Sequence, residues 1–115
     1  QFLVKKDVQF IEKIHQVIEE NLDNSDFNID TIASTIGLSR SAFFKKLKSL
    51  TGFAPVDLVK EIRLNKSIEL IKNSDMSISE IAFAVGFKDS GYFSKCFRKK
   101  YDQTPREYMN EWRKG

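Results

Sequence analysis

The sequence is poor in cysteine, proline and glycine, and each shortage excludes a class of protein. Its 115 residues include one cysteine, Cys96, which cannot form an internal disulfide and so indicates a reducing, cytoplasmic compartment. Two prolines and five glycines leave no room for a long linker or a low-complexity tract. No apolar run approaches the ~18 residues that a membrane-spanning helix needs, so we expect this domain to make no membrane contact.

Residues that carry catalysis or bind metals are also scarce. The single histidine, His15, has no cysteine or paired carboxylate near it, and one histidine with one cysteine cannot build a zinc site. Neither a glycine-rich phosphate loop nor a serine–histidine–aspartate arrangement is present. We therefore expect no enzyme activity, no metal and no cofactor. We interpret Cys96 as a small buried apolar residue and His15 as a surface or boundary residue.

The main feature that is present is an internal repeat, formed by residues 29–58 and 78–108. Ile29, Ile32, Ala33 and Gly37 match Ile78, Ile81, Ala82 and Gly86 at an offset of 49, whereas Phe43, Lys45, Leu47 and Pro55 match Phe93, Lys95, Phe97 and Pro105 at an offset of 50. The extra residue falls within 88–91, just after the glycine. A slip of one residue at a turn leaves both flanking helices intact, so the repeat is one of structure.

Positive charge is concentrated in the same part of each copy. The net formal charge of the chain is only +3, but residues 39–60 and residues 88–100 each sum to +4, whereas residues 7–31 sum to −6. Two matched basic segments favour a polyanion as partner. The alternative is that both segments are simply solvated helix faces.

Apolar spacing predicts an all-α chain of about seven helices, because no segment alternates with a period of two. The expected helices cover residues 7–22, 30–36, 41–51, 55–73, 78–85, 90–101 and 105–113. Val8, Ile11, Ile14 or His15, Ile18 and Leu22 define the apolar face of the first. The expected N-terminal caps are Asp30, Ser39 or Ser41, Ser77, and Asp89 or Ser90. Gly37, Gly52 and Gly86 end helices, and Asp102 occupies the place of Gly52 in the second copy.

These helices group into four parts along the chain. Residues 1–28 form an N-terminal helix that packs on the first subdomain, and residues 29–55 form a first helix-turn-helix. Residues 56–74 form a linker helix, and residues 75–115 hold the second helix-turn-helix and a C-terminal helix. The fold is thus a homeodomain-like pair of helix-turn-helix subdomains joined by a long helix. Because the sequence lacks an initiator methionine, we expect it to be part of a longer protein.

In each copy a short helix, a turn at a glycine and a second helix with small polar residues at its start form a helix-turn-helix pattern. Small polar groups let the start of a helix enter a DNA major groove, where serine and lysine can bond to base edges. Lysines and arginines one or two turns later would lie near phosphates. The linker helix would be ~27 Å long at 1.5 Å per residue. With a helix-turn-helix at each end, it is roughly the correct spacer for two helices that enter successive major grooves ~34 Å apart.

Three segments together resemble the DNA-binding domain of the AraC/XylS family of bacterial transcription regulators. They are IA…GLSRS…F.KKL…TG..P, the linker segment IRLNKSIELI, and I.EIAFAVGF.D.GYFSKCFRKKYDQTPREY. The resemblance covers residues 8–110. It implies seven helices, two recognition helices and double-stranded DNA as the partner of a domain that regulates transcription. The form SRSAFFKKLKSLTG followed by EIRL is further similar to the C-terminal output domains of Bacteroides-type hybrid two-component regulators.

The resemblance and the outward positions on each second helix together predict the contact residues. The base-contacting residues are Arg40, Ser41, Phe44 and Lys45 in the first copy, and Ser90, Gly91, Ser94 and Lys95 in the second. The phosphate-contacting residues are Lys48, Lys88, Arg98 and Lys99. Phe44 stands where many members carry a smaller or polar residue, and it either meets a thymine methyl or a sugar or packs inward. Gly91 has no side chain, so we expect the second helix to begin with backbone contacts alone.

Further partners follow from the resemblance. They are RNA polymerase and upstream signalling domains of the same polypeptide, and the full-length parent is either free in the cytoplasm or tethered to the membrane. A function of another class, a helical-repeat module that binds protein, is the alternative. Against it, repeats of the tetratricopeptide type have a period of ~34 residues and stack at least three units, whereas this chain has two units at about 50.

Overall fold

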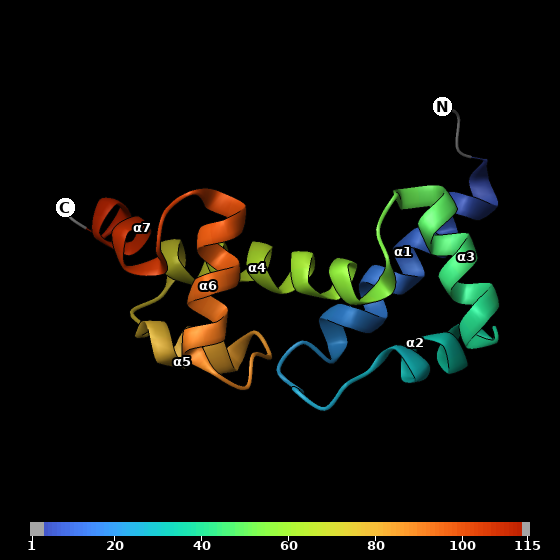
Figure 1. Ribbon diagram of the computed structural model, residues 1–115, viewed down its shortest axis with the longest axis horizontal. Helices are drawn as coiled ribbons and strands as arrows, with labels where there is room; N and C mark the ends of the chain where they lie inside the picture. The colour runs from blue at the N-terminus through green and yellow to red at the C-terminus, as the bar shows by residue number, and fades with distance from the viewer. Residues whose placement is uncertain (1–3, 114–115) are drawn as a thin grey trace. The chain divides into compact units, whose positions relative to one another are not determined.

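A computed structural model describes residues 4–113 of the chain, and those residues form seven α-helices and no strand. The helices are α1 (Lys5–Glu20), α2 (Ile29–Ile36), α3 (Arg40–Thr51), α4 (Pro55–Asn73), α5 (Ile78–Ala84), α6 (Ser90–Tyr101) and α7 (Pro105–Trp112) (Figure 1). This confirms the all-α fold and the helix order predicted from the sequence. None of the described helices combines the length and the apolar character that crossing a membrane requires.

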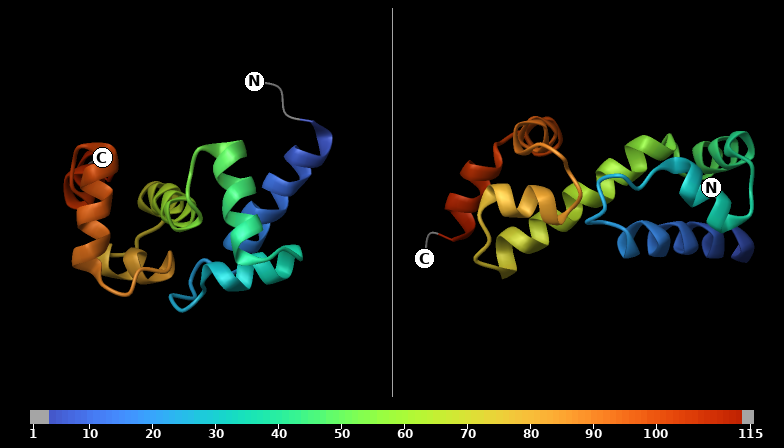
Figure 2. Two further views of the ribbon diagram at one scale, coloured as in Figure 1. Left: turned by 45° about the vertical axis from the view of Figure 1, so that its right-hand side comes forward. Right: turned by 90° about the horizontal axis from the view of Figure 1, so that it is seen from below.

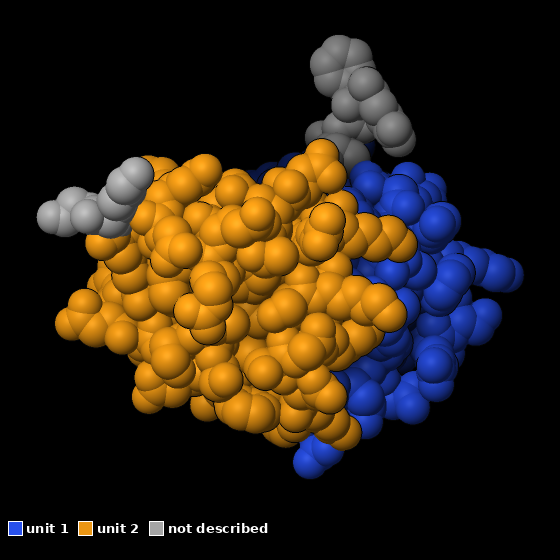
Figure 3. Space-filling view, turned by 60° about the vertical axis from the view of Figure 1, so that its left-hand side comes forward, with its two compact units in different colours: residues 1–21, 26–62 blue, residues 22–25, 63–115 orange. Residues whose placement is uncertain are grey.

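The chain divides into two compact units. Unit 1 holds residues 1–21 and 26–62, and unit 2 holds residues 22–25 and 63–115 (Figure 3). The division falls inside α4, between Ile62 and Arg63, so the first part of α4 belongs to unit 1 and the rest to unit 2. Residues 22–25, in the loop after α1, also belong to unit 2.

Unit 1 is built from α1, α2, α3 and the start of α4. Phe43 and Leu47 of α3 are completely buried, and the Phe43 ring meets Phe10 of α1 edge-on at a centroid distance of 6.3 Å. The buried face of α1 consists of Phe10, Ile14, Val17 and Ile18. The prediction that Val8 lies on this face was wrong, because the helix turns Val8 to the solvent and Phe10 inward.

Unit 2 is built from the rest of α4 with α5, α6 and α7, and its core is aromatic. Phe97 lies between the rings of Phe93, Tyr101 and Tyr108, at centroid distances of 5.8, 4.6 and 5.8 Å. The next turn of α7 brings Trp112 within 6.1 Å of Tyr108. Such contacts between rings contribute about 0.5–1.5 kcal/mol each beyond the area that they bury.

The end of α4 is held by an arginine from the last turn of the described chain. Arg113 donates hydrogen bonds to the carbonyl oxygens of Leu70, Ile71 and Met76, at 3.3, 2.9 and 2.7 Å. A helix leaves its last four carbonyls without partners, and a cation at that end also interacts favourably with the helix dipole. Arg113 therefore fixes α7 to α4 within unit 2.

Candidate nucleic-acid interface

In both units the turn that joins the paired helices has the same hydrogen bonds. Gly37 has a φ of 86° and Gly86 a φ of 100°, in the left-handed region that favours glycine. The residue after each glycine donates its N–H to the carbonyl of the matched alanine, Leu38 to Ala33 at 3.0 Å and Phe87 to Ala82 at 2.9 Å. These bonds turn the chain so that α3 and α6 each rise steeply from the helix before them (Figures 1 and 2).

The second helix of each pair is capped by a side chain at the residue that precedes it. The Ser39 hydroxyl accepts a hydrogen bond from the Ala42 N–H at 3.1 Å, and the Asp89 carboxylate accepts one from the Tyr92 N–H at 3.0 Å. Of the alternatives left open by the sequence, Ser39 and Asp89 are thus the caps. For α2 the prediction was wrong, because Asn28 rather than Asp30 accepts from Thr31 N–H, and Asp30 lies in the first turn of the helix.

Each second helix has one buried face and one exposed face that carries the predicted contact residues. The buried positions are Phe43 and Leu47 in α3, and Phe93, Cys96 and Phe97 in α6. Positions i, i+3, i+4 and i+7 lie together on one side of a helix. In α3 they are Ser41, Phe44, Lys45 and Lys48, and in α6 they are Gly91, Ser94, Lys95 and Arg98. We call these two sets the outer faces of α3 and α6.

The predicted contact residues are accessible in both units. Arg40, Ser41, Phe44, Lys45, Lys48, Lys88, Gly91, Lys95, Arg98 and Lys99 are exposed, and Ser90 and Ser94 are half-buried. Phe44 is 47% exposed, so of its two alternatives inward packing is not what the fold adopts. All of them lie on α3 or α6 except Lys88, which lies in the turn before α6.

Arg40, at the start of α3, forms an ion pair within the fold. Its guanidinium lies 3.4 Å from the carboxylate of Asp30 on α2, and the two side chains are 69% and 64% exposed. Exposed pairs of this kind contribute about 0–1 kcal/mol, so the pair holds Arg40 only weakly.

The helices α3 and α6 each carry four basic residues and no acidic residue. One basic residue of each helix is used within the fold. Lys46 lies over the ring of Phe10 at 4.4 Å, and the Lys100 ammonium donates to Asn65 at 2.9 Å. The other three on each helix extend from the exposed side. A helix that carries basic residues and no carboxylate attracts phosphate groups, because it has no negative side chain to repel them.

Tyr92 is a further exposed residue at the start of α6 that the sequence did not single out. It is 50% exposed and its ring lies 5.9 Å from that of Phe87 in the turn. Ala42 occupies the matched position in α3. The signal in the sequence was its position three residues after the cap, at the end of the helix that would enter a groove.

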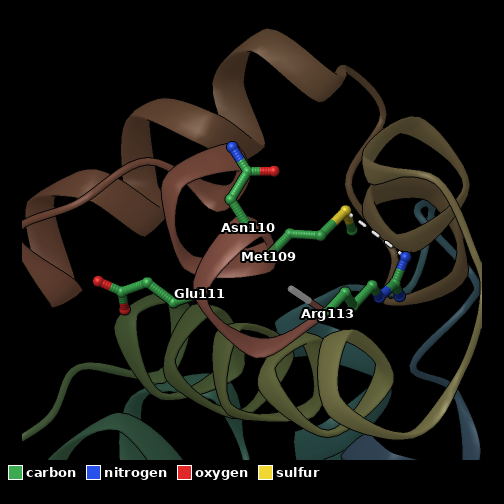
Figure 4. Close-up of a pocket in the computed structure, with 4 residues that line it drawn as sticks. All are labelled: Met109, Asn110, Glu111 and Arg113. Carbon is green, nitrogen blue, oxygen red and sulfur yellow. Dashed lines mark hydrogen bonds between the residues drawn. The ribbon is translucent and has the colours of Figure 1, made fainter. Parts of the chain in front are cut away.

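One surface hollow of unit 2 lies on α7. The hollow on α7 is lined by Met109, Asn110, Glu111 and Arg113, whose side chains do not converge on one point (Figure 4). Arg113 and Met109 lie toward one another, and Asn110 and Glu111 point away in other directions. Within residues 4–113 no three histidine, cysteine or carboxylate side chains come together as metal ligands would.

A family model described as a helix-turn-helix domain matches residues 32–111, which is most of the chain and includes both helix pairs. In a solved transcriptional regulator from Chromobacterium violaceum, described as AraC-type, 27% of residues are identical and the TM-score is 0.85 over 94% of this chain and 96% of that one. The chain belongs to the AraC-type helix-turn-helix family. This confirms the resemblance seen in the sequence and favours DNA binding over a helical protein-interaction module.

Two further similarities concern a DNA-binding domain solved with DNA and a protein much longer than this chain. The DNA-binding domain of AdpA, a global transcriptional factor solved in complex with a target DNA, is 28% identical to this chain, with a TM-score of 0.83 over 91% of this chain and 93% of that one. Histidine kinase P4 of Formosa agariphila is 38% identical over 106 residues. The match covers 92% of this chain and 8% of that kinase, so the chain corresponds to a small part of a much longer protein.

Proposed function

We propose that this AraC-type domain regulates transcription by binding a double-stranded DNA site of roughly 16–20 bp, with α3 and α6 in successive major grooves. The observation that carries the proposal is the repeated exposed face on a second helix that has four basic and no acidic residues. The AdpA relative, which was solved in complex with a target DNA, supports DNA as the partner.

The proposed base contacts and the proposed phosphate contacts differ in their positions along each helix and the turn before it. Ser41, Phe44 and Lys45 of α3 and Ser90, Gly91, Ser94 and Lys95 of α6 are the proposed base contacts, because they lie in the first half of each helix. Arg40 begins α3 and can exchange Asp30 for the DNA. Lys48, Lys88, Arg98 and Lys99 are the proposed phosphate contacts, and they would set affinity for all sequences.

The salt dependence of binding tests the proposal directly. If four phosphates are neutralised, the logarithm of the association constant should fall with the logarithm of salt concentration at a slope of about −3.6. Fluorescence anisotropy with labelled duplex DNA at several salt concentrations measures this slope. Lys99→Ala should make it shallower by about one unit. Lys13→Ala, on the exposed side of α1, is the matched control and should leave it unchanged. Affinity that does not fall as salt rises would refute the proposed phosphate contacts, and no binding to any duplex would refute DNA binding.

We further propose that the domain is the output part of a longer two-component regulator in the cytoplasm, or of one tethered to the membrane. The similarity to Histidine kinase P4 over 8% of that protein supports this arrangement. Its partners would then be the signalling domains of the same polypeptide and RNA polymerase. A test is to compare DNA affinity of the full-length polypeptide before and after phosphoryl transfer. Equal affinities, with transfer verified, would argue against this coupling.

A further inference from the structure

Phe44 is an apolar side chain in the middle of a polar and basic surface. It lies on the outer face of α3, where its helical neighbours are Ser41, Lys45 and Lys48. Phe43, the residue just before it, is completely buried and supplies an aromatic ring to the core of unit 1. Single exposed apolar residues are common on proteins. A large one at the centre of the surface proposed to meet DNA is a more specific observation.

The second copy of the repeat shows that this scaffold does not need an aromatic residue at the position of Phe44. Ser94 is the matched residue, at an offset of 50. The helices α3 and α6 have the same length, capped starts and left-handed C-caps, and Phe43 and Leu47 of α3 are buried at the positions of Phe93 and Phe97 of α6. A serine is therefore compatible with the same local fold, and packing alone does not account for the exposed phenylalanine.

The chemistry of the major groove narrows what a phenylalanine can contact there. The edges of the bases offer hydrogen-bond donors and acceptors, and the distinctive apolar group among them is the C5-methyl of thymine. The polar edges would lose water to Phe44 without gaining a hydrogen bond. 5-Methylcytosine carries its methyl group at the same C5 position.

We propose that Phe44 reads the C5-methyl group of a pyrimidine in the half-site bound by α3. This inference rests on the proposed DNA binding and adds the chemical group that one residue recognises. The half-site bound by α6, which has Ser94 at the matched position, has no such requirement at its equivalent base pair.

The experiment begins on the DNA, so that it does not depend on the folding of any variant. Duplexes bound by the wild-type domain are selected from random sequences, and each thymine of a selected site is replaced in turn by deoxyuridine, which lacks only the methyl group. At one thymine in the half-site of α3, affinity should fall about fourfold, the loss expected for one buried methyl-sized group. At that position 5-methylcytosine should bind better than cytosine by a similar factor, which distinguishes the methyl group from the rest of the thymine ring.

The protein variants then assign the effect to a residue. In Phe44→Ser the wild-type preference for thymine over uracil at that position should disappear. Phe83→Ser is the matched control, because Phe83 is 53% exposed but lies on α5, outside both outer faces. It should retain the methyl preference in full. Far-UV circular dichroism verifies that both variants are folded.

Two outcomes would overturn the inference, and they are distinguishable. In the first, duplexes bind with the expected salt dependence, but replacing thymine by deoxyuridine lowers affinity nowhere in the α3 half-site, or the preference for thymine survives in Phe44→Ser. The proposed role of Phe44 is then wrong and DNA binding stands. If no duplex binds at all, the proposed function fails and the inference fails with it.

Discussion

Gly86→Ala should destabilise the domain far more than Gly37→Ala, although the two glycines hold matched positions in the repeat. Both have positive φ, so both substitutions carry the strain of a left-handed alanine, about 1–2 kcal/mol. They differ in the space around the new methyl group. A Cβ at Gly37 would meet no atom within 4 Å, whereas at Gly86 it would lie 2.1 Å from the Leu22 carbonyl oxygen and 2.6 Å from Arg63 Nε.

The clash at Gly86 sets the size of the difference. The Arg63 side chain can move, but the Leu22 oxygen belongs to the backbone of residues 22–25, which pack in unit 2 and accept a hydrogen bond from Arg63 at Asn24. Forcing this backbone away resembles overpacking a core, which costs about 1–3 kcal/mol. We therefore expect a loss of about 1 kcal/mol for Gly37→Ala, after a gain of about 0.4–1 kcal/mol from the less flexible unfolded chain, and about 3 kcal/mol for Gly86→Ala.

The assay can follow unit 2 separately, because Trp112 is the only tryptophan and lies in that unit. Its ring is covered by the Lys72 ammonium at 4.2 Å, so its fluorescence should change when unit 2 unfolds. Urea titrations that record tryptophan fluorescence and far-UV circular dichroism give the free energy of unfolding for each variant. Equal losses for Gly86→Ala and Gly37→Ala would show that residues 22–25 are not held against the turn, and the reasoning would be refuted.

Three further predictions use other differences between the copies. Asp102 has a φ of 61°, which glycine adopts with less strain than aspartate. Asp102→Gly should therefore raise the free energy of unfolding by about 1 kcal/mol, and an unchanged thermal melting temperature would contradict this. The pKa values of Glu80 and Glu107 are lowered by the backbone N–H groups that they accept from, so their stabilisation is present above the ordinary value of 4.5 and is lost as the pH falls through their lower folded-state values. Replacing both with glutamine should flatten the acid limb of the stability curve, and an unchanged limb would exclude these caps as its cause. Lys45→Ala should alter the ranking of bound sequences, whereas Lys99→Ala should weaken all of them equally, and binding selections that retain the wild-type ranking in both variants would show that Lys45 does not contact a base.

The sequence was sufficient for the helices because caps and periodicity agree along most of the chain. Ser77 and Thr104 form capping boxes with the glutamates three residues later, and such boxes are local features that a sequence shows directly. The error at Asp30 has the same local origin. Asn28 and Asp30 are both good caps and stand only two positions apart, and Asp30 falls in the first turn, where an acid is also favourable.

The packing of residues 22–25 could not be predicted, because it depends on contacts that are distant in sequence. Arg63 reaches Asn24 across 39 residues, and Gly86 approaches Leu22 across 64. No short-range pattern marks either pair. Likewise, a count of basic residues could not show that Lys46 and Lys100 are used within the fold, since Phe10 and Asn65 reach them from other helices.

The differences between the two copies bear on the DNA site that such a domain would select. The capped starts match, and so do the buried pairs Phe43/Phe93 and Leu47/Phe97, so the scaffold presents two helices in similar local settings. On the outer faces, Lys45 and Lys95 agree, but Ser41 is matched by Gly91 and Phe44 by Ser94. Arg40 and Ser90 differ as well, so the two helices differ at three of their four matched base-contacting positions and have no physical reason to prefer the same bases. A site with two unlike halves is therefore expected, and an inverted or direct repeat of one half-site would have to arise from a second copy of the protein.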